Sequence, residues 1–235
     1  MLIFIHGGIP GVTPYASGPH VWKPAGFGNS KSVSLEGGTV DAMVSRLKSE
    51  ITEKAHLVGH DLGGLVALTV AAEIPDRVCT VSAVASVAAA PTGDAVPNLT
   101  LAHPPRPLFS RESQRWALER VSYSHHHIDD ALLDGCMQAA KKQEPVGEDF
   151  LPSLITAKSK LYEVSRSKGF PVPVQVLWGT HDPLGTFEQG LWLFRLLAAK
   201  QKAAQFHAVN RAGSLLFREE PQQFQQIVSA FVESA

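Results

Sequence analysis

A tight turn between two apolar segments most constrains what this chain can fold into. Its residues are Gly59-His60-Asp61-Leu62-Gly63-Gly64, and they follow the apolar run Ala55–Val58. A stretch rich in alanine and leucine comes directly after the turn and predicts a buried helix. Because glycine has no Cβ atom, it allows the close backbone approach that such a strand-turn-helix junction requires. The tip of the turn is Asp61, and a charged residue at a strained position is costly unless it has a use. We therefore interpret Asp61 as a carboxylate with a functional role. The alternative is a turn that keeps this shape but has lost its function.

Three further segments follow the order of the motifs of a known superfamily. Apolar residues 1–5 predict a buried strand that leads into His6-Gly7-Gly8-Ile9-Pro10-Gly11, which resembles an H-G-x-x-P-G oxyanion loop. Residues 26–30 resemble the G-x-G-x-S turn after the next strand, and residues 174–183 resemble the strand and turn that carry a triad acid. Together with the elbow pattern G-x-nucleophile-x-G, these motifs resemble those of the α/β-hydrolases.

Two branches of that superfamily share features with the chain. The Asp61 elbow resembles that of the epoxide hydrolases and haloalkane dehalogenases, whereas the oxyanion loop resembles that of carbon–carbon bond hydrolases, which use Ser at the elbow. Leu62 argues against a dehalogenase, because those enzymes usually place a Trp after the nucleophile. The resemblance implies an oxyanion hole made by the backbone N–H groups of Leu62 and of Gly8 or Ile9.

The resemblance also implies a catalytic role for three positions. Asp61 is the expected nucleophile, which attacks carbon and forms an ester, and Asp182 is the expected triad acid. The alternative for Asp182 is a purely structural role, in which its side chain caps a turn before Pro183. Ser214 stands where the family places the histidine that activates water. A serine is no base at neutral pH, so Ser214 binds water or substrate, or only fills the space.

A segment between the predicted core elements offers substitutes for the missing base. It contains Tyr123 and the run His125, His126 and His127. A lid histidine above Asp61 would replace the base, and Tyr123 is the candidate for a lid tyrosine that protonates an epoxide oxygen. The alternative is a solvated polar turn. Adjacent residues point apart, so the three histidines do not predict a metal site.

The order of the segments predicts the fold class and the domain organisation. Strands and helices alternate, which predicts an α/β fold with a mostly parallel sheet covered by helices on both faces. We expect residues 1–89 and 167–235 to form the α/β-hydrolase core. Clustered prolines and polar helical segments indicate a helical lid at 90–166. Compared with typical members, the strands before the oxyanion-loop strand are missing.

Composition narrows the possible partners. The chain has 235 residues and a net charge of −1, which does not favour nucleic acid or an anionic membrane. The two cysteines, in a predicted strand and a predicted lid helix, do not form a disulfide framework, and we see no signal peptide. We therefore expect a cytoplasmic protein with a small-molecule substrate, no cofactor and no metal; the oligomeric state stays open.

Three hypotheses for the function remain at this point. The first is a hydrolase-like enzyme for a small apolar molecule, of the epoxide, carbon–halogen, carbon–carbon or ester type, with Asp61 as nucleophile or acid–base. The second is a non-hydrolytic lyase, isomerase or cyclase on the same fold, which the loss of the histidine favours. The third is a small-molecule binder without catalysis.

Overall fold

The computed structural model describes residues 1–7, 26–28, 30–35, 38–91, 99–108, 110–141 and 147–234. Gly8 and Ile9, with most of the predicted oxyanion loop, lie outside the described residues.

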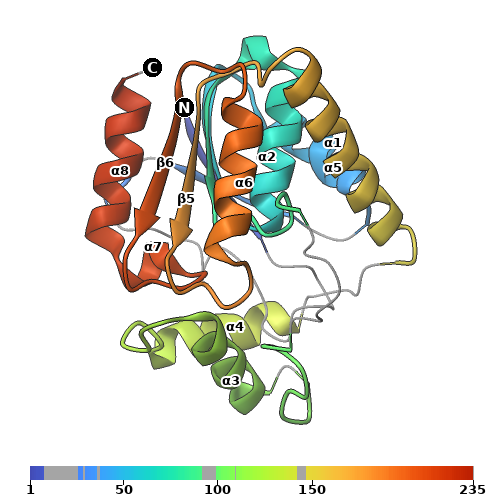
Figure 1. The fold of residues 1–235 in the computed structure, drawn as a ribbon. Helices are drawn as coiled ribbons and strands as arrows, with labels where there is room; N and C mark the ends of the chain where they lie inside the picture. The colour runs from blue at the N-terminus through green and yellow to red at the C-terminus, as the bar shows by residue number, and fades with distance from the viewer. Residues whose placement is uncertain are drawn as a thin grey trace.

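A six-stranded parallel sheet forms the centre of the molecule (Figure 1). Its order is β2-β1-β3-β4-β5-β6, and each neighbouring pair is parallel, which confirms the predicted α/β-hydrolase fold. The strands are β1 (Leu2–His6), β2 (Lys31–Ser34), β3 (Ala55–His60), β4 (Val78–Val84), β5 (Val174–Gly179) and β6 (Ala204–Val209).

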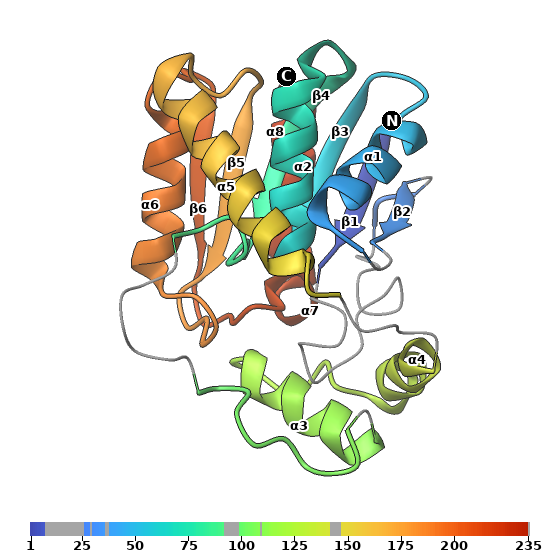
Figure 2. The same ribbon diagram turned by 90° about the vertical axis from the view of Figure 1, so that its right-hand side faces the viewer.

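Helices cover both faces of the sheet (Figure 2). On one face lie α1 (Val40–Glu50), α2 (Leu62–Glu73), α5 (Phe150–Ser167) and α6 (Phe187–Ala198), and on the other lies α8 (Pro221–Glu233). Successive strand residues enter different cores, since Ile3 and Ile5 belong to one hydrophobic cluster and Phe4 to the other. This alternation is the two-residue period of a strand, which here buries both faces.

Helix α2 begins at the predicted elbow and is enclosed on nearly all sides. Residues 62–71 are all buried, because the helix lies between the sheet and helices α1 and α5. Thr69, a polar residue in this helix, donates its hydroxyl to the Leu65 carbonyl oxygen at 2.8 Å. The short 3-10 helix η1 (Pro75–Arg77) follows α2 and leads into β4.

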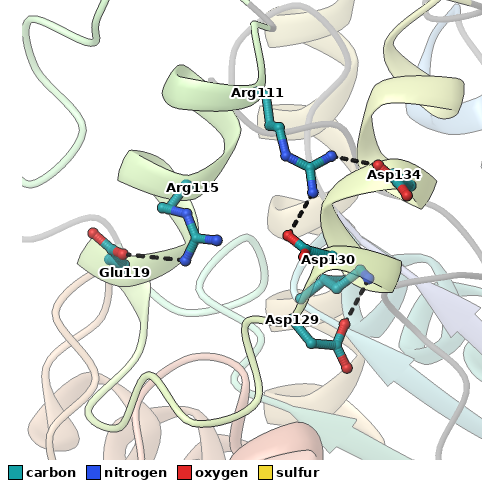
Figure 3. Close-up of polar contacts among 7 residues, drawn as sticks. Arg111, Arg115, Glu119, Asp129, Asp130 and Asp134 are labelled. Carbon is teal, nitrogen blue, oxygen red and sulfur yellow. Dashed lines mark hydrogen bonds and ion pairs between the residues drawn. The ribbon is translucent and has the colours of Figure 1, made fainter.

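Two helices lie beyond the carboxyl ends of the strands, apart from the helical layers (Figure 1). They are α3 (Arg111–Val121) and α4 (Asp130–Ala140), which we call the α3–α4 hairpin. Arg111 of α3 pairs with Asp130 and Asp134 of α4, so one guanidinium group links the two helices (Figure 3). Side chains cap both helices at their N-termini, Ser110 on α3 and Asp129 on α4.

Helix α5 lies within the segment 90–166 that the sequence predicts as the lid, apart from its last residue. It packs against α1, α2 and α6, in the helical layer on the sheet. The short helix α7 (Leu216–Glu219) precedes α8 and lies near the carboxyl end of β6 (Figure 1).

Candidate active site

Glycines at the elbow between β3 and α2 allow neighbouring backbone segments to approach closely. A Cβ atom on Gly59 would lie 2.3 Å from the Gly63 carbonyl oxygen, and one on Gly63 would lie 2.3 Å from the Ile5 carbonyl oxygen. Asp61 has a positive φ of 46°, a conformation that is rare for a residue with a side chain. Its N–H donates to the Val84 carbonyl oxygen of β4 at 3.0 Å. The strained turn therefore holds the Asp61 side chain at the carboxyl ends of the central strands.

The loop that follows β4 donates hydrogen bonds to Asp61. The Ala88 N–H donates to Asp61 Oδ1 at 3.0 Å, and the Ser86 hydroxyl donates to the Asp61 carbonyl oxygen at 2.7 Å. Burial raises the pKa of Asp61 to about 6, and the N–H groups of Ala88 and Leu62 oppose that rise. The N–H of Leu62, expected to form part of an oxyanion hole, thus acts on the carboxyl of Asp61 itself. A carboxyl with this pKa gains and loses a proton near neutral pH.

A second carboxyl, that of Asp182, lies in the turn after β5. Its Oδ1 accepts from the Ser214 hydroxyl at 2.7 Å and from the N–H groups of Leu184 and Gly185 at 2.9 and 3.3 Å. Its Oδ2 is buried without a hydrogen-bond partner among the described residues. Burial raises the pKa of Asp182 to about 7, these three hydrogen bonds oppose the rise, and the negative charge of Asp61 adds to it. Asp61 and Asp182 therefore lie close enough to influence each other's protonation.

Ser214 is held in place from three sides. Its N–H donates to the Val121 carbonyl oxygen at 2.9 Å, its hydroxyl donates to Asp182, and its carbonyl oxygen lies 3.1 Å from His60 Nε2. The structure thus brings two of the three predicted catalytic positions, Ser214 and Asp182, into direct contact. Burial lowers the pKa of His60 to about 4, so this histidine is neutral. Its ring packs on Phe217, with 5.2 Å between the ring centroids.

The four candidate residues after α3 have their contacts elsewhere. The Tyr123 ring lies against His181, with 4.5 Å between the ring centroids. One ring nitrogen of each of the three histidines has a partner near its own segment, namely Glu119 O for His125, Ser124 Oγ for His126 and Ser122 Oγ for His127. None of these contacts involves Asp61 or Asp182. Burial, with the positive charge of Arg218 as a second cause, lowers the pKa of His127 to about 4.

Sequence reasoning missed three residues that build this site. Ser86 and Ala88 contact Asp61 from the loop after β4, and Glu219 accepts hydrogen bonds from the backbone beside Ser214. A backbone N–H donor such as that of Ala88 leaves no mark in a sequence. Glu219 is easier to notice, because residues 219–221 form a Glu-x-Pro pattern at the start of a helix.

The described residues offer no group of three or more metal-binding side chains. Within the same parts of the chain, no helix has both the length and the apolar character that crossing a membrane requires.

Asp61 is expected to destabilise the fold above its pKa. Its ordinary pKa is 3.8, and burial raises that to about 6 in the folded chain. The folded state therefore binds the proton more tightly, and stability is lost as the pH rises from about 4 to about 6. Asp61→Asn removes this cost, so we expect the variant to be more stable than the parent by about 2 kcal/mol at about pH 8, after discounting for partial exposure.

Urea unfolding of both proteins at about pH 4 and about pH 8 measures this difference. The gain should shrink to a small fraction at the lower pH, where the folded carboxyl is protonated and the unfolded one is about half protonated. A gain of the same size at both pH values would contradict burial of a titrating carboxyl.

Comparisons with known proteins agree with this architecture. The chain matches the model of the alpha/beta hydrolase family over residues 2–226. It is 26% identical over 261 residues to a 2-hydroxy-6-oxo-6-phenylhexa-2,4-dienoate hydrolase of Comamonas testosteroni, covering 98% of this chain and 87% of that protein.

Solved structures share the fold at lower identity. A meta-cleavage product hydrolase of Pseudomonas fluorescens superposes with a TM-score of 0.63 at 21% identity, covering 99% of this chain and 90% of that one. A carboxylesterase of Bacillus subtilis superposes with a TM-score of 0.70 at 17% identity, covering 100% and 84%. With the family model matching nearly the whole length, this chain belongs to the alpha/beta hydrolase family.

Proposed function

We propose that the chain is an enzyme for a small, largely apolar molecule, in which Asp61 transfers a proton as general acid or base. The observation that carries this proposal is the carboxyl of Asp61, a half-buried residue on the strained elbow, whose pKa is raised by loss of water contact to about 6. Proton transfer is most efficient when the pKa of the catalytic group lies near the working pH. Groups with strongly perturbed pKa values are also concentrated at functional sites.

The contact between Ser214 and Asp182 supports a carboxyl pair in place of a triad. Asp182 Oδ1 accepts the Ser214 hydroxyl where the family's acid orients an imidazole. A serine hydroxyl cannot carry a proton between the reactants at neutral pH. The pKa of Asp182, raised to about 7, suits it to hold the proton that the absent imidazole would hold.

The relative from Comamonas testosteroni suggests a substrate class. The substrate in its name, 2-hydroxy-6-oxo-6-phenylhexa-2,4-dienoate, combines an aryl ketone with a conjugated enol. Protons next to ketones and enols move by acid–base catalysis, which a carboxyl such as that of Asp61 can supply. We therefore propose conjugated ketones of this kind as the first substrates to test, with the α3–α4 hairpin as the lid above them.

A nucleophilic Asp61, as in the epoxide hydrolases and haloalkane dehalogenases, is the second candidate. Its place at the elbow favours this role, since that position carries the family's nucleophile. Hydrolysis of the resulting ester needs a base to activate water. Among the described residues, no histidine hydrogen-bonds to Asp61 or Asp182, which favours proton transfer over ester chemistry.

Intact mass spectrometry after incubation with an epoxide or an alkyl halide separates the two roles. We expect no lasting adduct on the parent protein, because Asp61 acts on protons. A stable adduct on Asp61 that Ser214→His releases would contradict proton transfer and establish the nucleophilic role, with Asp182 orienting the new imidazole. Ser45→His, at an exposed position of α1, is the control for adding a histidine elsewhere.

A further inference from the structure

Glu219 is a buried carboxylate that accepts three hydrogen bonds, all from backbone N–H groups. Its side chain is 2% exposed. Oε2 accepts from the N–H groups of Tyr123 and Ser124, both at 2.8 Å, and Oε1 accepts from the N–H of Gly213 at 2.9 Å. In the part of the chain that the structure describes, it forms no ion pair with Lys or Arg. A buried charge held by N–H groups alone is costly, because burial raises its pKa against these bonds.

The donors belong to two segments that lie far apart in the sequence. Tyr123 and Ser124 follow α3, whereas Gly213 directly precedes Ser214. The two segments also touch without Glu219, since a Cβ atom on Gly213 would lie 2.6 Å from the Val121 carbonyl oxygen and 2.9 Å from the Tyr123 nitrogen. Glu219 therefore closes a joint between the end of α3 and the backbone that carries Ser214.

We propose that Glu219 is a positioning residue for the site, whose carboxylate fixes the Gly213–Ser214 backbone against the end of α3 and so keeps the Ser214 hydroxyl on Asp182. This inference rests on the proposed function, because the Ser214–Asp182 contact matters for catalysis only if Asp182 belongs to the site. Both ends of the joint are short, geometrically constrained contacts, so a small displacement of Gly213 moves Ser214 with it.

A carboxylate suits this joint better than an amide or a shorter acid. Each of its two oxygens accepts, so it satisfies all three N–H groups at once. Glu219→Gln keeps the volume but turns one acceptor into an NH₂ donor that faces a backbone N–H. We therefore expect Glu219→Gln to open one end of the joint. Glu220→Gln is the matched control, because Glu220 is the next residue in the chain and its side chain is exposed.

Carbon-13 NMR titration of the Asp182 carboxyl tests the proposal without a substrate. Ser214→Ala should weaken Asp182 as an acid by about tenfold, which raises its measured pKa, because the hydrogen bond that favours the charged form is lost. Glu219→Gln should raise it by at least about half as much, and the double variant should go no further than Ser214→Ala alone. Glu220→Gln should leave it unchanged. Loss of the Glu219 charge by itself would lower the pKa of Asp182, so the sign separates positioning from simple electrostatics.

An unchanged or lowered pKa in Glu219→Gln, or additive effects in the double variant, would overturn the proposal. If Glu219→Gln does not fold, the test is made on the parent protein. The chemical shifts of its backbone amide protons are followed by NMR while the pH is varied through the titration of Glu219. The Ser214 N–H, which bonds to Val121, should then shift with the same midpoint as those of Gly213, Tyr123 and Ser124. A Ser214 amide shift that does not change at this midpoint would overturn the inference. Neither readout uses turnover, so both are independent of whether Asp61 proves catalytic.

Discussion

Asp61→Asn is expected to lower kcat/KM by about 10²- to 10⁴-fold, the usual contribution of a general acid or base. The amide keeps the shape of the side chain and can still accept from the Ala88 N–H, but it cannot exchange a proton. Turnover of conjugated aryl ketones, and deuterium uptake from D₂O into the substrate, measure the loss. Asp76→Asn, at an exposed aspartate just beyond α2, is the matched control and should retain full activity.

Two results would contradict this expectation. Equal turnover in Asp61→Asn and the parent would remove Asp61 from the chemistry. Saturable binding of the same ketones without turnover or deuterium uptake in the parent would instead support a small-molecule binder. Loss of activity without loss of stability at neutral pH is the pattern expected of a reactive carboxyl on a strained turn.

Gly63→Ala is expected to destabilise the chain by more than about 4 kcal/mol or to prevent folding. The new Cβ atom would lie 2.3 Å from the Ile5 carbonyl oxygen and 3.1 Å from an Ile5 side-chain carbon, so β1 or the elbow would have to move. Alanine is otherwise the better helix former, by about 1 kcal/mol, so the loss measures the steric conflict.

Gly147→Ala is the control for this substitution, because none of the described residues lies within 4 Å of a Cβ atom at that position. Thermal and urea unfolding compare both variants with the parent. Equal stability of Gly63→Ala and Gly147→Ala would mean that the elbow does not require the close approach of β1.

The fold was predictable because its elbow and strand motifs carry steric requirements in their residue types. Gly59 and Gly63 are needed where backbones meet, and the apolar strands are buried on both faces. The place of α5 was harder to predict. An amphipathic pattern shows that one face of a helix is buried, but not whether it packs on the other helices of the core or on the α3–α4 hairpin. Helix α2, buried nearly all round, has no such pattern at all.

For the candidate site, the sequence points to side chains but not to the backbone groups that hold them. Asp61, Asp182 and Ser214 could be named from motif positions, and the structure adds the direct contact between Ser214 and Asp182. The roles of Ala88 and Glu219 depend on backbone N–H groups, whose direction is set by tertiary packing. The raised pKa values of the two aspartates likewise come from burial, which a sequence does not give residue by residue.

Carbon-13 NMR titration of the Asp61 carboxyl in the parent protein tests the central claim most directly. The account predicts that Asp61 titrates at about pH 6, and Asp182 at about pH 7. Asp61→Asn should lower the measured pKa of Asp182, because it removes the nearby negative charge that raises it. Titration of both carboxyls near the ordinary value of 3.8, with no effect of Asp61→Asn on Asp182, would contradict a carboxyl pair that holds a proton near neutral pH.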